Sequence, residues 1–278
     1  MERSPSFRER ATEATTKGIM RFFRAGVEAT PLNYTIEGKE YITQARGLLS
    51  EGKIVVPVLD HRGFADLVTG ACVAIKEDFD DLVQVADIVM KMSYLQTFPT
   101  NLLPKYFRII PVVSHTMADY PNRDEINGQA IERAQNLADG SLLIITPEGT
   151  RSGQVGIQEA RYGSERFWHG RGERYVLPLA VEGSERQWPR KLGMVAGGAY
   201  YNFYGRFKNA RFIFGEPKGV EYYDSIAERL AAGNPDDFAR LKTEVVMAEI
   251  ARLHLEKGRA EYAGRYADLA RELIKIRS

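Results

Sequence analysis

The stretch Ile54-Val55-Val56-Pro57-Val58-Leu59-Asp60-His61-Arg62-Gly63-Phe64-Ala65-Asp66 runs from an apolar segment into a polar turn. Its first part, Ile54–Leu59, is rich in β-branched residues and has the length of a buried strand. Helical spacing begins after Gly63 and continues over Phe64–Ile75. A buried strand that leads through a short turn into a helix is the repeating unit of α/β proteins, so this stretch predicts that fold class.

The alternation of strands and helices continues along the chain. A second helix is expected over Asn127–Leu137, where Asp139-Gly140 supplies a stop signal. We therefore expect an α/β fold with a mostly parallel central sheet flanked by helices. Further apolar runs predict the remaining buried strands: Ile109–Val113, Leu142–Thr146, Val176–Val181 and Arg211–Phe214.

The chain is divided into three segments. Residues 1–30 are expected to form an amphipathic helical segment, residues 31–219 the α/β domain, and residues 220–278 a C-terminal helical extension packed on the same domain. A short single apolar stripe in the extension favours a helix that packs on the core over a helix that forms a dimer contact. The stripe follows 4-3-4-3 spacing: Tyr262, Tyr266, Leu269, Leu273 and Ile276.

The segment Lys17–Val27 has two unlike faces when its residues are placed about 100° apart. One face carries Lys17, Arg21 and Arg24, and the other carries isoleucine, methionine, phenylalanine and valine side chains. Such a helix suits a membrane interface and equally suits a cap on the domain, and the sequence leaves both alternatives open.

Composition excludes several classes of protein. With 38 basic and 37 acidic residues the net charge is +1, so a nucleic-acid binder is not expected. The one cysteine, Cys72, allows no internal disulfide, and the polar N-terminus lacks the apolar core of a signal peptide. No uninterrupted apolar run approaches the roughly 20 residues that span a bilayer. We therefore expect a cytoplasmic protein, with peripheral attachment to the inner face of the membrane through residues 17–27 as the alternative.

His61 and Asp66 form the first candidate site. His61 lies in the turn after Ile54–Leu59, at the carboxyl edge of the expected sheet, where open α/β folds bind ligands. Asp66 falls in the first turn of the following helix, where the helix dipole stabilises a carboxylate. That carboxylate can accept a hydrogen bond from one imidazole nitrogen, which fixes the tautomer in which the other nitrogen acts as a base. The pair predicts general base catalysis, although a His-x4-Asp spacing alone also occurs by chance.

A second polar island, Thr146-Pro147-Glu148-Gly149-Thr150-Arg151-Ser152, follows another apolar run. Gly149 lets the backbone approach a ligand closely. Arg151 presents a planar fork that suits a phosphate or a carboxylate, and Thr150 adds a hydroxyl donor. Glu148 anchors an arginine or binds a ligand hydroxyl. The alternative for any one of these residues is a polar turn with a surface salt bridge.

The two islands, at strand ends and in this order, resemble the glycerolipid acyltransferase family, which includes the lysophosphatidic acid and glycerol-3-phosphate acyltransferases. His61 and Asp66 match its first block, His-x4-Asp. Pro147–Ser152 match its third block, Pro-Glu-Gly-Thr-Arg-Ser, without a change. Its fourth block, an apolar strand with an early proline, is matched by Val176–Val181. The resemblance covers residues 53–216.

The second block departs from the family pattern. The family has a glycine, an apolar stretch and then an arginine near the acceptor site. This chain has Arg108 at the glycine position and Ser114 at the arginine position. Either Arg108 supplies the missing charge from a new position, or the acceptor lacks the usual phosphate.

The resemblance implies transfer of a fatty acyl group from acyl-CoA or acyl-carrier protein to a hydroxyl of glycerol-3-phosphate, a lysophospholipid or a similar acceptor. His61 would act as the general base and Asp66 would orient it. No cofactor and no metal are expected, because the acyl donor is a co-substrate and no paired histidine or cysteine spacing occurs. Residues of the second island, together with one from the second block, would bind the substrate: Glu148, Gly149, Thr150, Arg151 and Arg108.

Two rival functions use the same residues. In an acyl thioester or ester hydrolase, His61 would activate water, whereas a non-catalytic lipid-binding protein would keep the scaffold without needing the dyad. Cys72 is another candidate nucleophile, but its place in a helical stripe without a nearby charge favours a buried structural thiol. The arginine- and glycine-rich region Gly163–Arg174 is either a basic lip over the site or a solvated loop.

Overall fold

The computed structural model of the chain describes residues 31–277 apart from 64, 80, 83–84, 96–107, 115–116, 150–155, 162, 188–198, 202 and 232–233. The N-terminal segment Lys17–Val27 and the predicted substrate residues Thr150 and Arg151 lie outside the described residues. In the described part of the chain, no helix is both long enough and apolar enough to cross a membrane.

The core of the protein is one eight-stranded sheet in the order β1-β7-β6-β2-β5-β3-β4, with β8 paired to β6. Neighbouring strands are parallel except where β6 pairs with β7 and with β8. The predicted α/β fold with a mostly parallel sheet is therefore confirmed. The strands are β1 Tyr34–Glu37, β2 Ile54–Leu59, β3 Ala86–Lys91, β4 Arg108–Val112, β5 Leu142–Ile144, β6 Arg174–Glu182, β7 Ala210–Phe214 and β8 Lys218–Gly219.

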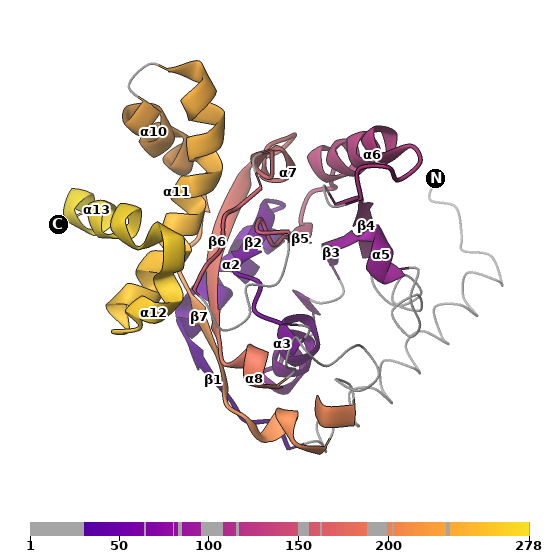
Figure 1. Cartoon of the computed structure of the whole chain (residues 1–278), viewed down its shortest axis with the longest axis vertical. Coiled ribbons are helices and arrows are strands. Elements are labelled where there is room, and N and C mark those ends of the chain that lie inside the picture. The colour runs from indigo at the N-terminus through magenta and orange to yellow at the C-terminus, as the bar shows by residue number, and fades with distance from the viewer. Residues whose placement is uncertain are drawn as a thin grey trace.

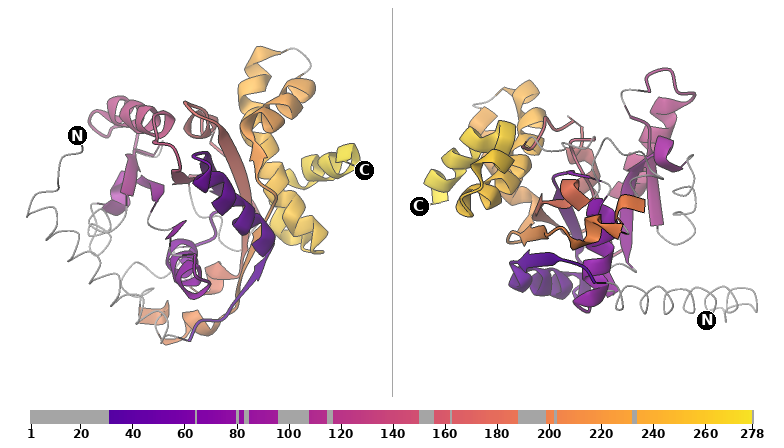
Figure 2. Two further views of the ribbon diagram at one scale, coloured as in Figure 1. Left: turned by 180° about the vertical axis from the view of Figure 1, so that it is seen from behind. Right: turned by 60° about the horizontal axis from the view of Figure 1, so that its bottom comes forward.

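Helices cover both faces of the sheet, and this burial explains why its central strands read as continuous apolar runs. Successive side chains of a strand point to opposite faces. In β2, Val56 and Val58 join the core cluster shared with the C-terminal helices and α6, whereas Val55 joins a separate cluster that includes Ala45 of α2. Figure 1 and the left view of Figure 2 show the C-terminal helices on one side of the sheet and α3 on the other.

The predicted elements correspond to observed ones with small shifts at their ends. The five predicted strands are found as β2, β4, β5, β6 and β7, whereas β1, β3 and β8 were not predicted. The helices are α2 Lys39–Ser50, α3 Ala65–Lys76, α5 Met92–Leu95, α6 Arg123–Gln135, α7 Glu165–Trp168, α8 Ser184–Gln187, α10 Val220–Ala231, α11 Pro235–Glu256, α12 Ala260–Ala263 and α13 Ala267–Arg277, with 3-10 turns η2 Gly205–Phe207 and η3 Gly264–Tyr266.

The C-terminal apolar stripe does not lie on one continuous helix, which corrects the sequence prediction. Gly264 adopts a φ of 57°, a left-handed conformation that ends α12 before η3 and α13 begin. Tyr266 and Leu273 are buried and belong to the same core cluster as Val56 of β2. The expectation that the stripe packs on the α/β core is therefore confirmed for these two residues.

Candidate active site

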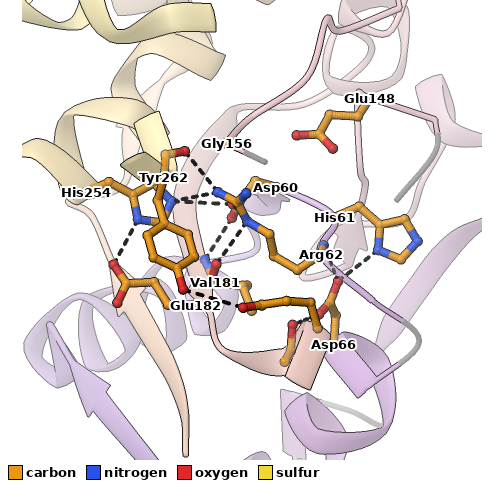
Figure 3. A network of polar contacts seen from close by, with 12 residues as sticks. Asp60, His61, Arg62, Asp66, Glu148, Gly156, Val181, Glu182, His254 and Tyr262 are labelled. Atoms are coloured by element: carbon orange, nitrogen blue, oxygen red, sulfur yellow. Dashed lines mark hydrogen bonds and ion pairs between the residues drawn. The ribbon is translucent and has the colours of Figure 1, made fainter. Parts of the chain in front are cut away.

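His61 and Glu148 follow neighbouring parallel strands at one edge of the sheet. β2 pairs in parallel with β5, and a bridge between Val58 and Ile145 continues the pairing toward the carboxyl ends of both strands. His61 lies just beyond β2, and Glu148 lies in the turn after β5. Figure 3 shows both side chains around Arg62. The two polar islands therefore meet in space although they are far apart in the sequence.

The predicted contact between His61 and Asp66 is confirmed. Nδ1 of His61 lies 2.8 Å from Oδ2 of Asp66. The His61 side chain is 14% exposed, so its ring reaches solvent, while the Asp66 side chain is fully buried. Because an ionised carboxylate only accepts hydrogen bonds, Nδ1 of His61 is the protonated nitrogen and Nε2 is the basic one. This is the arrangement of a histidine base oriented by a carboxylate.

Asp66 also holds the turn that carries His61. Its Oδ2 accepts the backbone N–H groups of Arg62 at 2.7 Å and of Gly63 at 2.9 Å. Its Oδ1 accepts the hydroxyl of Ser184, at the start of α8. Asp66 lies in the first turn of α3, as predicted, where a carboxylate is favoured by the helix dipole. One buried carboxylate thus fixes the histidine, the turn and the beginning of α8 together.

Glu148 is fully buried at the same edge. Its Oε1 accepts the N–H of Gln158 at 3.2 Å, whereas Oε2 has no hydrogen-bond partner among the described residues. Burial raises the pKa of Glu148 well above its usual 4.5, the charge of Asp60 raises it further, and Arg62 opposes the shift. A protonated carboxyl donates a hydrogen bond as well as accepting one. Glu148 is therefore suited to present a neutral O–H group to a ligand.

Arg161, just before the arginine- and glycine-rich region, lies beside the turn that carries Glu148. Gly149 adopts a φ of 61°, and a Cβ at this position would lie 3.3 Å from Cγ of Arg161. The backbone N–H of Arg161 donates to the carbonyl of Pro147 at 2.8 Å, which closes the loop between them. Arg161 is exposed. Its guanidinium therefore extends from the base of the loop that carries Glu148.

A buried network of charged residues joins the turn after β2 to the C-terminal helices (Figure 3). Arg62 is fully buried, forms an ion pair with Asp60 at 2.5 Å and donates to the carbonyl of Tyr262 at 3.0 Å. The imidazole of His254, on α11, lies 3.3 Å from Asp60 and 3.0 Å from Glu182. The turn after β2 is therefore bonded to α12 through the Tyr262 carbonyl and to α11 through His254.

The network favours a positively charged His254. Burial lowers the pKa of this imidazole, but the hydrogen bonds with Asp60 and Glu182 outweigh burial and raise the pKa above its ordinary 6.5. Burial raises the pKa of Asp60. Arg62 and His254 outweigh burial and lower this pKa below its ordinary 3.8. Sequence reasoning missed this network. The available signal was that Asp60 and Arg62 flank the candidate base in a turn after a buried strand.

Arg108 lies at the opposite edge of the sheet, which corrects the sequence prediction. It is the first residue of β4, and β4 runs parallel to β3, so Arg108 stands at the amino edge. Its guanidinium forms an ion pair at 2.7 Å with buried Asp87, which also pairs with Arg133 at 2.8 Å. A strand of this length separates its two ends by about 15 Å. Ser114, two residues after β4 ends, lies instead at the carboxyl edge of the sheet.

The region Gly163–Arg174 combines buried residues with an exposed loop at residues 170–173, so the solvated-loop alternative holds for that part. Trp168 of α7 is buried in the main core cluster. Arg174 begins β6 at the amino edge, is buried, and donates to the carbonyls of Ala134 and Gln135 at 2.9 Å. An arginine that satisfies the last carbonyls of a helix stabilises that helix end, so Arg174 serves packing. Arg166 and Arg171 of the same region are exposed.

The remaining candidate groups stay outside the site. Burial raises the pKa of the Cys72 thiol to about 11, so the thiol is protonated at neutral pH and is a poor nucleophile. His169 pairs with Asp224 at 3.0 Å and with the carbonyl of Glu165 at 2.7 Å. The described part of the chain contains no cluster of three or more side chains placed to hold a metal ion.

The chain matches no protein-family model and no curated protein. The resemblance to the glycerolipid acyltransferases therefore stays a prediction from the sequence blocks that carry His61, Asp66 and Glu148.

Proposed function

We propose that the protein is an O-acyltransferase that moves a fatty acyl group from acyl-CoA or acyl-carrier protein to a hydroxyl of glycerol-3-phosphate, a lysophospholipid or a similar acceptor. The observation that carries the proposal is the 2.8 Å contact between His61 and Asp66 at the sheet edge where Glu148 is buried. Both parts of this edge come from the blocks that resemble the acyltransferase family. We further propose that the enzyme works in the cytoplasm, attached peripherally to the inner face of the membrane.

In the proposed reaction, Nε2 of His61 takes the proton of the acceptor hydroxyl while that oxygen attacks the thioester carbonyl. The new C–O bond forms, the C–S bond breaks, and the leaving thiolate takes the proton back from the imidazolium. Asp66 stabilises the imidazolium between these steps. General base catalysis of this kind contributes about 10²–10⁴-fold to the rate. No covalent acyl-enzyme is required, in keeping with the raised pKa of Cys72.

The acceptor is proposed to lie between His61 and the loop that carries Glu148. A neutral Glu148 donates a hydrogen bond to an acceptor oxygen without placing a second negative charge beside a phosphate. Arg108 lies at the far edge, so we propose Arg151 of the motif and Arg161 beside Gly149 as the cations that bind a phosphate. Holding the hydroxyl close to the base in this way contributes as much as the proton transfer itself.

The proposal is tested by offering the full-length protein acyl-CoA and a mixed panel of alcohol acceptors, with products identified by mass spectrometry. His61→Ala is expected to lower turnover by about 10²–10⁴-fold without unfolding the protein, because the ring is partly exposed. Cys72→Ala is the control and is expected to remain active. Unchanged turnover in His61→Ala would remove the proposed base.

The same assay separates the rival functions. Release of free CoA and fatty acid at one rate with and without acceptors would indicate a hydrolase that uses His61 to activate water. Binding of acyl-CoA without any turnover, in wild type and in His61→Ala alike, would indicate a lipid-binding protein.

A further inference from the structure

One short segment between α8 and β7 carries most of the exposed large hydrophobic side chains. Among the described residues such side chains are Phe203 at 71% exposure, Tyr204 at 66%, Phe207 at 48% and Ile274 at 36%. We refer to Phe203, Tyr204 and Phe207 as the aromatic patch. Clustered exposed hydrophobic side chains mark a surface that contacts something other than water.

The sequence around the aromatic patch is basic and free of acids. Across residues 186–211 there is no aspartate and no glutamate, although the whole chain is nearly neutral at +1. Lys208 is exposed next to Phe207, and the guanidinium of Arg206 lies 5.1 Å from the centre of the Phe207 ring. Arg186 and Arg211, at the two ends of the segment, form ion pairs with Glu185 and Glu37. The other basic residues of the segment are Arg190, Lys191, Arg206 and Lys208.

The aromatic patch is attached to the edge of the sheet where His61 lies. The hydroxyl of Thr69, on α3, donates to Gln187 at 2.6 Å and lies 3.2 Å from the hydroxyl of Tyr201. Ser184 donates to Asp66. The connection from β6 to β7 is therefore bonded to the helix that contains the dyad carboxylate. In Figure 1, α8 lies beside α3, and the orange turns before β7 lie below both helices.

The N-terminal part of the chain joins the fold at the same place. The backbone N–H of Asn33 donates to the carbonyl of Arg206 at 3.0 Å, and its side-chain amide donates to the carbonyl of Phe207 at 3.2 Å. The segment Lys17–Val27, whose composition suits a membrane interface, is thus connected along the chain to a residue that touches η2. Asn33 therefore fixes the first described residues of the chain against η2, beside the aromatic patch.

We propose that the aromatic patch binds an anionic lipid bilayer. Phe203 and Phe207 would enter the boundary between headgroups and acyl chains, and the Tyr204 hydroxyl would stay among the headgroups, as amphipathic rings do in membrane proteins. Arg206 and Lys208 would contact lipid phosphates, since each basic residue near an anionic surface adds to binding. We favour lipid over a protein partner because the exposed rings lie beside cations, and residues 186–211 contain no acid that could pair with the basic side chains of a partner.

The binding is tested by sedimenting the full chain with vesicles made of equal parts phosphatidylcholine and phosphatidylglycerol, and with vesicles of phosphatidylcholine alone. The double variant Phe203→Ser, Phe207→Ser is expected to lower partitioning onto the anionic vesicles by at least about tenfold. Ile274→Ser is the matched control, because it removes the remaining exposed hydrophobic side chain of the described residues, on α13. Lys208→Gln is expected to weaken binding about fivefold on the anionic vesicles only.

Circular dichroism confirms that each variant is folded before sedimentation. Equal partitioning of the double variant and Ile274→Ser would overturn the proposal, as would loss of all binding on deletion of residues 1–30 with no effect of the double variant. A wild-type dimer that the double variant dissociates, without any lipid binding, would assign the patch to a second copy of the chain instead. Sedimentation needs no turnover, so an inactive His61→Ala variant that still binds vesicles would separate this surface from the proposed reaction.

Discussion

At the scale of single residues, Asp66 combines an orienting role with a structural one. Its carboxylate receives hydrogen bonds from His61, from two backbone N–H groups of the turn and from the Ser184 hydroxyl. In Asp66→Asn an NH₂ group must face at least one of these donors. We expect a loss of about 1–3 kcal/mol in the free energy of unfolding together with a large loss of turnover.

Urea unfolding and kcat measured on the same preparations check this expectation. Ser184→Ala is the matched control: it removes one donor to Asp66 without touching His61, and is expected to cost about 1 kcal/mol while turnover changes little. If Asp66→Asn unfolds at the wild-type urea concentration, the carboxylate does not hold the turn as its contacts indicate.

The surroundings of Glu148 disfavour the negatively charged form of its carboxyl group. The pKa raised by burial means that the unfolded chain releases this proton near 4.5 while the folded protein keeps it to a higher pH. Stability is therefore lost as pH rises from 4.5 through the raised pKa. Glu148→Gln removes this loss, so the variant is expected to be about 1 kcal/mol more stable than wild type at neutral pH, with a gain that disappears below 4.5.

The turnover of variants at Glu148 tests whether this position acts as a neutral hydrogen-bond donor or as a charged carboxylate. An amide NH₂ can donate as a protonated carboxyl does. Glu148→Gln is therefore expected to keep turnover within about tenfold of wild type, whereas Glu148→Ala loses the hydrogen bond and raises the acceptor KM. Equal, complete inactivation of both variants would show that the ionised form is needed.

At the scale of secondary-structure elements, the sequence predicts best those strands that are buried on both faces. β2 and β6 are apolar almost throughout, so their positions follow from the sequence alone. β3 was missed because Asp87 and Lys91 interrupt its apolar run. Asp87 is tolerated in a buried position because Arg108 and Arg133 neutralise it, and those partners come from other elements. The same ion pair engages the guanidinium of Arg108, which the sequence predicted to bind substrate, at the amino edge of the sheet.

The site residues, like the strands, fall into those that the sequence predicts and those that it does not. His61, Asp66 and Glu148 could be predicted because each lies in a short motif after a strand, and parallel neighbours place such ends together. The network behind them could not, because Arg62 and His254 are 192 positions apart and only the fold brings them together. The aromatic patch was also missed, since exposure of a ring cannot be read from the sequence.

Gly156 and Gly264 set the distance between α12 and the segment after the second island, because a Cβ at Gly156 would lie 2.5 Å from Cα of Gly264. A Cβ at Gly264 would lie 2.4 Å from the backbone nitrogen of Ile157, and the φ of 57° is left-handed. Because the obstacle is backbone, Gly264→Ala is expected to cost about 3 kcal/mol or more. Gly258→Ala is the matched control: its φ of 68° is also left-handed but no described atom lies within 4 Å of the Cβ position, so only about 1–2 kcal/mol is expected. Equal melting temperatures for the two variants would contradict the close packing.

At the scale of the whole molecule, the C-terminal helices and the sheet share one core. Val58 of β2, Ala134 of α6, Val246 of α11 and Leu273 of α13 belong to the same buried cluster. Asp60, which pairs with both Arg62 and His254, adds a buried polar connection between the same two layers. Charge in this connection therefore acts on the stability of the entire fold and not only on the turn that carries His61.

The pH dependence of unfolding tests that connection. The folded protein holds the proton of His254 more tightly than the unfolded chain does, because Asp60 and Glu182 outweigh burial and raise its pKa. The stabilisation by this group is complete below 6.5, the unfolded value, and is lost as pH rises through the raised folded value. The difference in unfolding free energy between wild type and His254→Gln is therefore expected to be largest below 6.5 and to shrink at alkaline pH.

His169→Gln is the matched control for this measurement. Hydrogen bonds with Asp224 and Glu165 likewise outweigh burial and raise the pKa of His169, but its side chain is 28% exposed. Solvent screening weakens an ion pair of this kind, so the same direction with a smaller amplitude is expected. His254 is enclosed by Asp60, Glu182, Arg62 and the Tyr262 ring, whose centre lies 5.4 Å from that of the imidazole. A stability difference for His254→Gln that grows with rising pH would mean that Arg62, and not the two acids, decides the charge of this histidine.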